Sequence, residues 1–201
     1  SAVNIPGLNA EVMERLKPHL NLAETLGILS NQISGGQVKE LEVRLQGELA
    51  KHPAQPIIVA ALKGFLSNAI GERINYVNAA LEAKGRGINV LEIKDEAIRD
   101  FAGGSLQITT RADQGDHKLT GTVFADGDLR ITCIDEFPVN VSPSQHMLFT
   151  RHRDMPGIIG QIGSLLGKYN VNIASMQVGR RIVRGEAVMV LSIDDPIPSE
   201  L

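Results

Sequence analysis

Apolar residues recur at every third or fourth position over residues 9–33, and this spacing predicts an amphipathic helix. Asn9 is suited to cap the start of this helix, and Pro18 is expected to break or kink it. From position 41, apolar and polar residues alternate, which predicts a strand with one solvent-facing side that runs to about residue 49. The chain therefore opens with a helix and a strand.

The rest of the first 142 residues repeats these two patterns. Helical spacing predicts helices at residues 57–70 and 77–83, and apolar runs predict strands at residues 88–93, 106–111, 119–125 and 129–134. Asp126-Gly127 is a strong two-residue hairpin signal between the last two strands. We therefore expect residues 9–142 to form an α+β domain with a mostly antiparallel sheet, preceded by a linker at residues 1–8.

Pro138 and Pro143 flank a short segment that we expect to link the first unit to a second unit at residues 146–201. The pattern there predicts a strand, a helix and two further strands, at residues 147–151, 156–166, 171–178 and 187–193. This order is most of a ferredoxin-like βαββαβ unit, without its last helix and strand. The expected fold class is therefore α+β in both units.

Composition narrows the classes of function. A net charge of −3 and an aromatic content of 3% provide neither the basic surface nor the stacking platform that nucleic acids need. No apolar run reaches the ~20 residues of a membrane span, and the first residues lack the regions of a signal peptide. We expect a protein of the cytosol or an organelle that binds neither nucleic acid nor membrane. The single cysteine, Cys133, excludes an internal disulfide and is expected to be a buried thiol.

No set of residues in the chain predicts catalysis or metal binding. The five histidines lack metal-ligand spacing, and one cysteine cannot build a thiolate site. Asp135 and Glu136 are adjacent, so a strand or turn points their carboxylates apart. We therefore predict no catalytic residue and no metal ligand here.

Glycine is frequent along the helix expected in the second unit. The spacing G-x-x-G-x-x-G from Gly157 differs from the G-x-G-x-x-G of dinucleotide-binding turns, and Gly167-Lys168 lacks the rest of a phosphate loop. We interpret Gly160, Gly163 and Gly167 as positions where the helix packs closely on its sheet.

The residues that precede this helix predict a binding site for a small zwitterion. Asp154 lies just before the helix start, where free backbone N–H groups and the helix dipole favour an anion. An amino acid fits, since its carboxylate suits those N–H groups and Asp154 suits its ammonium. Asn172 adds a polar side chain if the next strand runs beside the helix start. An equally open alternative is that Asp154 only caps the helix and Asn172 only forms a turn.

Residues 147–198 resemble an ACT domain, the small-molecule regulatory module of amino-acid metabolism, in the motifs D-x-P-G-x-x-G-x-I-G and V-N-I-x-x-M. Upstream, the segments AVNIPGL, ALKGFL and TGTVFADGDLRIT resemble the C-terminal part of long-form D-3-phosphoglycerate dehydrogenases of cyanobacteria and plastids. The resemblance implies an intervening, allosteric substrate-binding domain followed by an ACT domain. It also implies that the ACT domain binds L-serine at an interface between subunits, and therefore that the protein is a homo-oligomer.

The resemblance further implies contacts for two ligands. Those for L-serine are Asp154 for the amino group, Asn172 for a side-chain contact, His152 as a flanking position, and the backbone N–H groups of Ile158, Ile159 and Gly160 for the carboxylate. Arg130 matches a basic position proposed to bind an anion in the intervening domain of a relative.

The family's dinucleotide fingerprint and its catalytic Arg, Glu and His do not occur within these 201 residues. The resemblance therefore implies NAD only for a parent enzyme that oxidises 3-phosphoglycerate in the first step of L-serine biosynthesis, in the cytoplasm or, in a eukaryote, the plastid. Two alternatives are kept. In one, the domains only assemble the enzyme; in the other, the intervening domain senses a phosphorylated substrate near Arg130 and the ACT domain is vestigial.

Overall fold

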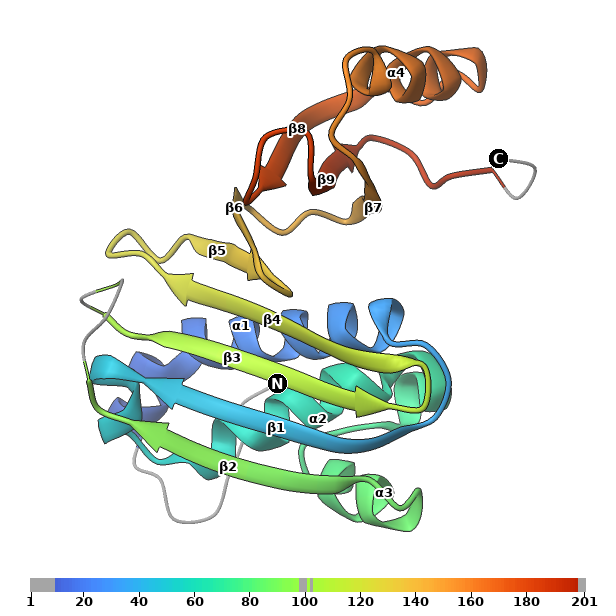
Figure 1. Ribbon diagram of the computed structural model, residues 1–201. Coiled ribbons are helices and arrows are strands. Elements are labelled where there is room, and N and C mark those ends of the chain that lie inside the picture. The colour runs from blue at the N-terminus through green and yellow to red at the C-terminus, as the bar shows by residue number, and fades with distance from the viewer. Residues whose placement is uncertain (1–9, 98–100, 102, 199–201) are drawn as a thin grey trace. The chain divides into compact units, whose positions relative to one another are not determined.

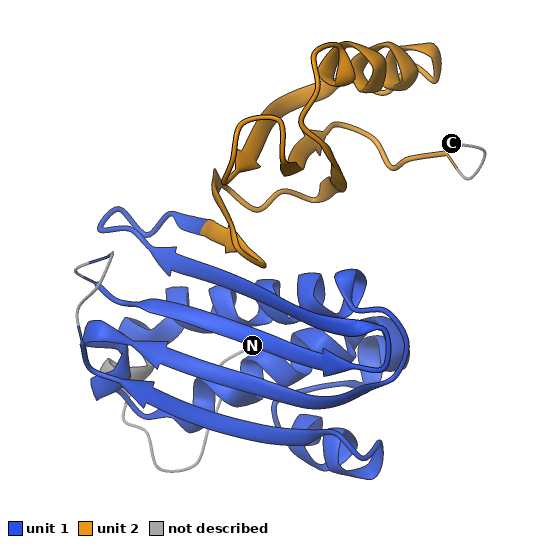
Figure 2. Cartoon of the chain, viewed as in Figure 1, with its two compact units in different colours: residues 1–130 blue, residues 131–201 orange. Residues whose placement is uncertain are grey.

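The computed structural model describes residues 10–97, 101 and 103–198, which divide into two compact units, residues 1–130 and 131–201 (Figure 2). The linker expected at residues 1–8 and the cap expected at Asn9 lie outside the described residues. The domain boundary expected between residues 142 and 146 remains a prediction. We describe each unit by itself.

Unit 1 is a layer of helices on one face of a sheet (Figure 1). Its strands have the hydrogen-bonded order β2-β1-β3-β4, and only the β1–β2 pair is parallel. The elements are α1 (Ala10–Ile33), β1 (Val38–Gln46), α2 (Ala54–Ile70), α3 (Ala79–Gly85), β2 (Asn89–Asp95), β3 (Ser105–Ala112) and β4 (Gly115–Val123), with short 3₁₀ helices at Gly47–Lys51 and Gly71–Arg73. The α+β class predicted from the alternating pattern is confirmed.

The core of unit 1 lies between the sheet and the two long helices. Leu41, Val43 and Leu45 of β1 are fully buried, as the alternation of apolar and polar residues predicted. Helices α1 and α2 cross at very short range. A Cβ at Gly27 of α1 would overlap the backbone carbonyl of Ala61 in α2. A Cβ at Gly64 would likewise overlap the backbone of α1. Two glycines thus permit backbone-to-backbone packing of the helices.

Of the break or kink expected at Pro18, a break does not occur, since α1 continues as one helix of 24 residues through that position. A proline inside a helix costs a hydrogen bond and a steric clash, roughly 3 kcal/mol. Leu16 and Leu20, on either side of Pro18, are both buried in the core. Their burial offsets the local cost because packing stabilises a helix more than the propensity of single residues does.

Strand β1 ends at Gln46, three residues before the expected end. Gly47 has a φ of +62°, which lies outside the strand region, and begins a 3₁₀ helix. Leu49 is almost completely buried in that helix. The apolar pattern therefore predicted the burial of residue 49 correctly, but it predicted a strand where the backbone forms a 3₁₀ helix.

The link expected around Pro138 is instead a strand, β6 (Phe137–Val141). It pairs antiparallel with β5 (Leu129–Ile134), with Ile134 opposite Phe137. Val139 and Val141 point inward and are buried, so a short alternating pattern forms a strand despite the prolines. Strand β5 contains the division between the units, because unit 1 ends at Arg130.

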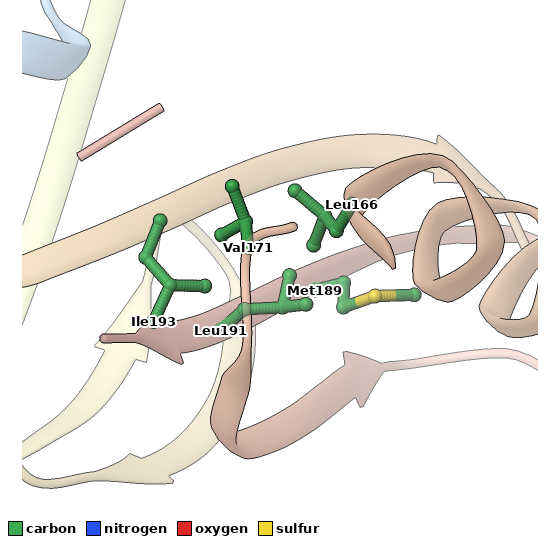
Figure 3. Close-up of a cluster of buried hydrophobic side chains, with 5 residues drawn as sticks. All are labelled: Leu166, Val171, Met189, Leu191 and Ile193. Carbon is green, nitrogen blue, oxygen red and sulfur yellow. The ribbon is translucent and has the colours of Figure 1, made fainter. Parts of the chain in front are cut away.

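Unit 2 also contains β7 (His146–Arg153), α4 (Ile158–Lys168), β8 (Ile173–Arg180) and β9 (Glu186–Ile193) (Figure 1). These three strands form an antiparallel sheet in the order β7-β9-β8. Its core is a cluster of buried side chains from α4, the turn after it and β9: Leu166, Val171, Met189, Leu191 and Ile193 (Figure 3). This β-α-β-β order is the predicted part of a ferredoxin-like unit.

The stability of unit 1 is expected to depend on the protonation of His19 in α1. Burial, with the charge of His52 second, lowers the pKa of His19, and its Nδ1 is a buried atom without a hydrogen bond. The unfolded chain therefore binds this proton at a higher pH than the folded chain does. The free energy of unfolding should therefore fall as pH decreases through about 6.5, the ordinary pKa of histidine.

This prediction is checked by urea unfolding of the wild type and of His19→Gln at about pH 7.5 and about pH 5.5. The wild type should lose more stability on acidification than the variant. Equal losses would show that His19 does not carry the effect.

Candidate functional site

The carboxylate of Asp154 ties the end of β7 to the hairpin between β8 and β9. The backbone N–H of Asp154 also donates to the carbonyl of Gly185 at 2.8 Å. Its Oδ2 accepts from Nη1 of Arg180 at 2.6 Å and from the backbone N–H of Arg184 at 3.2 Å. Hydrogen bonding from Arg180, and then from Arg184, holds the pKa of the Asp154 carboxyl below its usual range. Asp154 is therefore an ionised, half-buried carboxylate that is paired with the guanidinium of Arg180.

Helix α4 begins four residues after Asp154. Gly157 takes a left-handed φ of +93° at the cap position, which reverses the chain into the helix. The N–H of Gln161 makes the first helical hydrogen bond, to the carbonyl of Gly157 at 2.9 Å. The N–H of Ile158, also predicted to contact the effector, instead donates to the carbonyl of Met155 at 3.4 Å. The N–H groups of Ile159 and Gly160 belong to the first turn, where the helix supplies no acceptor of its own. Backbone donors and a carboxylate thus occur together at this end of unit 2.

The expectation that the glycines of α4 pack closely on the sheet is wrong. Among the described residues, a Cβ at Gly160, Gly163 or Gly167 would meet no atom within 4 Å apart from its chain neighbours and the nearby backbone of α4 itself. The neighbouring Ile159 is 53% exposed. Helix α4 instead contacts the core through a different stripe, which includes Ile162 and Leu166. The glycines leave one side of α4 small and open.

Asn172 lies at the other end of the sheet from Asp154. Asn172 directly precedes β8, whose first residue is paired with Ile193 of β9. Asp154 directly follows Arg153 of β7, which is paired with Glu186 at the other end of β9. Seven residues of strand separate these two pairs, or roughly 23 Å. The Nδ2 of Asn172 donates to Oδ2 of Asp194 at 2.6 Å. Within one chain, β8 therefore does not bring Asn172 to the start of α4.

His152 and Arg130 have neighbours of their own. His152 is half-buried on β7, with Nδ1 3.5 Å from the hydroxyl of Thr150. In unit 1, Nη2 of Arg130 donates to Asp128 at 3.1 Å, and its guanidinium lies 5.9 Å from the centre of the Phe124 ring. Asp128 therefore already neutralises part of the charge that an anion would use at Arg130.

Sequence reasoning missed Arg180 and Arg184, which are the partners of Asp154. They lie in the run Arg180-Arg181-Ile182-Val183-Arg184, about 30 positions after the carboxylate in the chain. A dense group of arginines between two predicted strands was an available signal. Nothing in the sequence placed that hairpin beside the end of β7.

A pocket of about 450 Å³ on unit 1 contains none of the predicted site residues; it is lined by parts of α2, α3 and β2, among them Ile58, Lys84 and Glu92. In residues 10–97, 101 and 103–198, no group of three His, Cys, Asp or Glu side chains could hold a metal ion. No described helix is long and apolar enough to cross a membrane.

The start of α4 does not fit NAD. A dinucleotide-binding turn joins a strand of a parallel sheet to a helix through G-x-G-x-x-G. Strand β7 belongs to an antiparallel sheet, and the glycines after it are spaced three apart. We therefore assign no step of NAD chemistry to these residues.

An α+β unit followed by a β-α-β-β module defines a two-domain α+β protein with a candidate ligand site in its second domain. Residues 15–135 match the model of the D-3-phosphoglycerate dehydrogenase intervening domain, and residues 146–201 match that of the ACT domain. The chain belongs to the D-3-phosphoglycerate dehydrogenase intervening-domain family and also contains an ACT domain. The resemblance found in the sequence is confirmed.

Individual relatives agree with this family. A D-3-phosphoglycerate dehydrogenase of Synechocystis is 60% identical over 202 residues, which are all of this chain and 36% of that protein. The one of Methanocaldococcus jannaschii is 37% identical over all of this chain and 38% of its own length. D-3-phosphoglycerate dehydrogenase 2, chloroplastic, of Arabidopsis thaliana is 31% identical over 97% of this chain and 34% of its own length. The chain thus spans little more than a third of these relatives.

Proposed function

We propose that this chain is the regulatory part of an NAD-dependent D-3-phosphoglycerate dehydrogenase and that its ACT domain binds L-serine, the end product of the pathway. The observation that carries the proposal is the joint position of the Asp154 carboxylate and the first turn of α4. We further propose a cytoplasmic enzyme, or a plastid one in a eukaryote, with its catalytic residues and NAD site outside these residues; a relative named as chloroplastic supports the plastid alternative.

Recognition of a zwitterion follows from the charges at this end of unit 2. Backbone N–H groups of Ile159 and Gly160, and the positive end of the helix dipole, attract the carboxylate of the ligand. Asp154 attracts its ammonium through a charge-assisted hydrogen bond. A ligand with only one of these charges would satisfy one half of the site and leave the other half unpaired.

A complete site requires two chains, because Asn172 and Asp154 lie at opposite ends of one sheet. Strand β8 is an edge of that sheet, and two such edges pair antiparallel across a two-fold axis. Antiparallel pairing sets the start of one β8 beside the end of the other. Asn172 of the partner subunit then approaches Arg180 and the Asp154 that Arg180 contacts. We therefore propose a homo-oligomer with the effector between subunits.

Calorimetric titration of the chain with L-serine, ethanolamine and lactate tests this function. L-serine should bind, whereas ethanolamine, which lacks the carboxylate, and lactate, which lacks the ammonium, should bind at least tenfold more weakly. A chain that assembles but gives no heat with L-serine would favour a purely structural module. Equal binding of all three ligands would contradict recognition of the zwitterion.

A further inference from the structure

The hairpin between β8 and β9 is attached at its base and loosely attached at its tip. At its base, Gly179 lies against β6 so closely that a Cβ would be 2.5 Å from the carbonyl oxygen of Pro138. At its tip, Ile182 and Val183 are 72% and 68% exposed. The tip therefore has no apolar anchor among the described residues. Polar contacts with other elements must hold it.

Asp154 makes most of those polar contacts. It bonds to three successive parts of the hairpin: the side chain of Arg180, the backbone N–H of Arg184 and the carbonyl of Gly185. Among the described residues, a further contact is an ion pair between Arg181 and Glu136, on the turn between β5 and β6. The same carboxylate proposed to bind an effector thus also fastens the hairpin.

We propose that Arg180 is a competing cation at this carboxylate, and that the ammonium of the effector must displace its guanidinium from Asp154. This inference rests on the proposed function, because it assigns a regulatory residue to the same site. The hairpin is then fastened through Arg180 only when the effector is absent. Effector binding exchanges an ion pair within the chain for one with the ligand.

The geometry around Asp154 favours the replacement of one cation by another at a single carboxylate oxygen, Oδ2. Both contacts converge on Oδ2, and the side chain of Asp154 is only 22% exposed. The Arg184 contact is a backbone N–H held by the hairpin, whereas the Arg180 side chain is half exposed and can turn into water at little cost. A second cation beside an engaged guanidinium would meet like-charge repulsion. Displacement of Arg180 removes that repulsion.

Effector binding at Asp154 can also affect residues outside the pocket. Arg180 and Arg181 are consecutive, and Arg181 pairs with Glu136 on the turn that follows β5. Strand β5 runs across the division between the two units at Arg130. Release of the hairpin at Asp154 therefore alters an element that is covalently continuous with unit 1.

The test compares Arg180→Gln with the matched variant Arg181→Gln, which loses the same charge one residue away but does not contact Asp154. L-serine affinity is measured by calorimetry in the chain. We expect Arg180→Gln to bind about 3- to 10-fold more tightly than the wild type, and Arg181→Gln to change affinity by less than about twofold. Titration of the Asp154 carboxyl by NMR, without ligand, should show a higher pKa in Arg180→Gln only.

Three results would count against the proposal in distinguishable ways. Equal or weaker binding by Arg180→Gln would overturn the inference and leave the proposed function intact, since Arg180 would then assist the ligand. An unchanged Asp154 pKa in that variant would show that the ion pair does not form in solution. No binding by the wild type or by either variant would overturn the proposed function itself.

Discussion

Replacement of Gly64 by alanine is expected to destabilise unit 1 by about 3 kcal/mol or more. A Cβ at this position would overlap the carbonyl oxygen of Glu24 in α1. That atom is backbone, so it cannot rotate away as the end of a side chain can. The two helices would have to separate along their contact, which exposes core residues such as Leu26 and Leu62.

Urea unfolding measures this effect, with Gly85→Ala as the matched control. Gly85 ends α3, has no positive φ and has open space where its Cβ would be, so alanine there should change stability by less than about 1 kcal/mol. Gly27→Ala provides an independent test on the facing helix, where the overlap is with Ala61. If Gly64→Ala unfolded at the same urea concentration as Gly85→Ala, the close helix crossing would be wrong.

Replacement of Asp154 by asparagine is expected to weaken L-serine binding by about 10- to 100-fold. The substitution removes the negative charge that binds the ammonium but keeps the shape of the side chain. Its amide oxygen can still accept from the N–H of Arg184, so the end of β7 should remain attached to the hairpin. The loss should therefore appear in affinity and not in the folding of unit 2.

Glu186→Gln is the matched control for this variant. Glu186 is an exposed carboxylate of the same sheet and pairs with Arg151 at 2.6 Å, as Asp154 pairs with Arg180. Its replacement should change L-serine affinity by less than about twofold. Calorimetry gives the affinities, and circular dichroism checks that both variants are folded. Equal losses in the two variants would indicate a general effect of charge, with no specific role for Asp154.

Much of the fold could be predicted because burial follows the hydrophobic pattern. The alternation around Val43 predicted β1, and Asp126-Gly127 predicted a turn in which the N–H of Gly127 donates to the carbonyl of Phe124 at 2.9 Å. Local rules failed where packing between distant segments decides the backbone. Pro18 stays helical because α1 is buried on both sides of it, and β6 forms because it can pair with β5.

The candidate site was predictable only in the part that is local in sequence. Asp154 and the start of α4 are neighbours in the chain, so the motif around Pro156 located both. Arg180 reaches Asp154 through the pairing of β8, β9 and β7, which no short motif encodes. The sheet register also determines how far Asn172 lies from Asp154. The sequence patterns therefore did not predict how β7, β9 and β8 pair, and this pairing determines which residues meet at the site.

Complementation between two inactive variants tests most directly whether the effector site joins two chains. Asp154→Asn and Asn172→Ala should each bind L-serine weakly when made alone. When the two are co-expressed and reassort at random across a two-fold axis, each mixed pair contains one intact site. The mixture should then bind L-serine with wild-type affinity at about one quarter of the wild-type number of sites per chain. A mixture that binds no better than either variant alone would contradict a site shared between subunits.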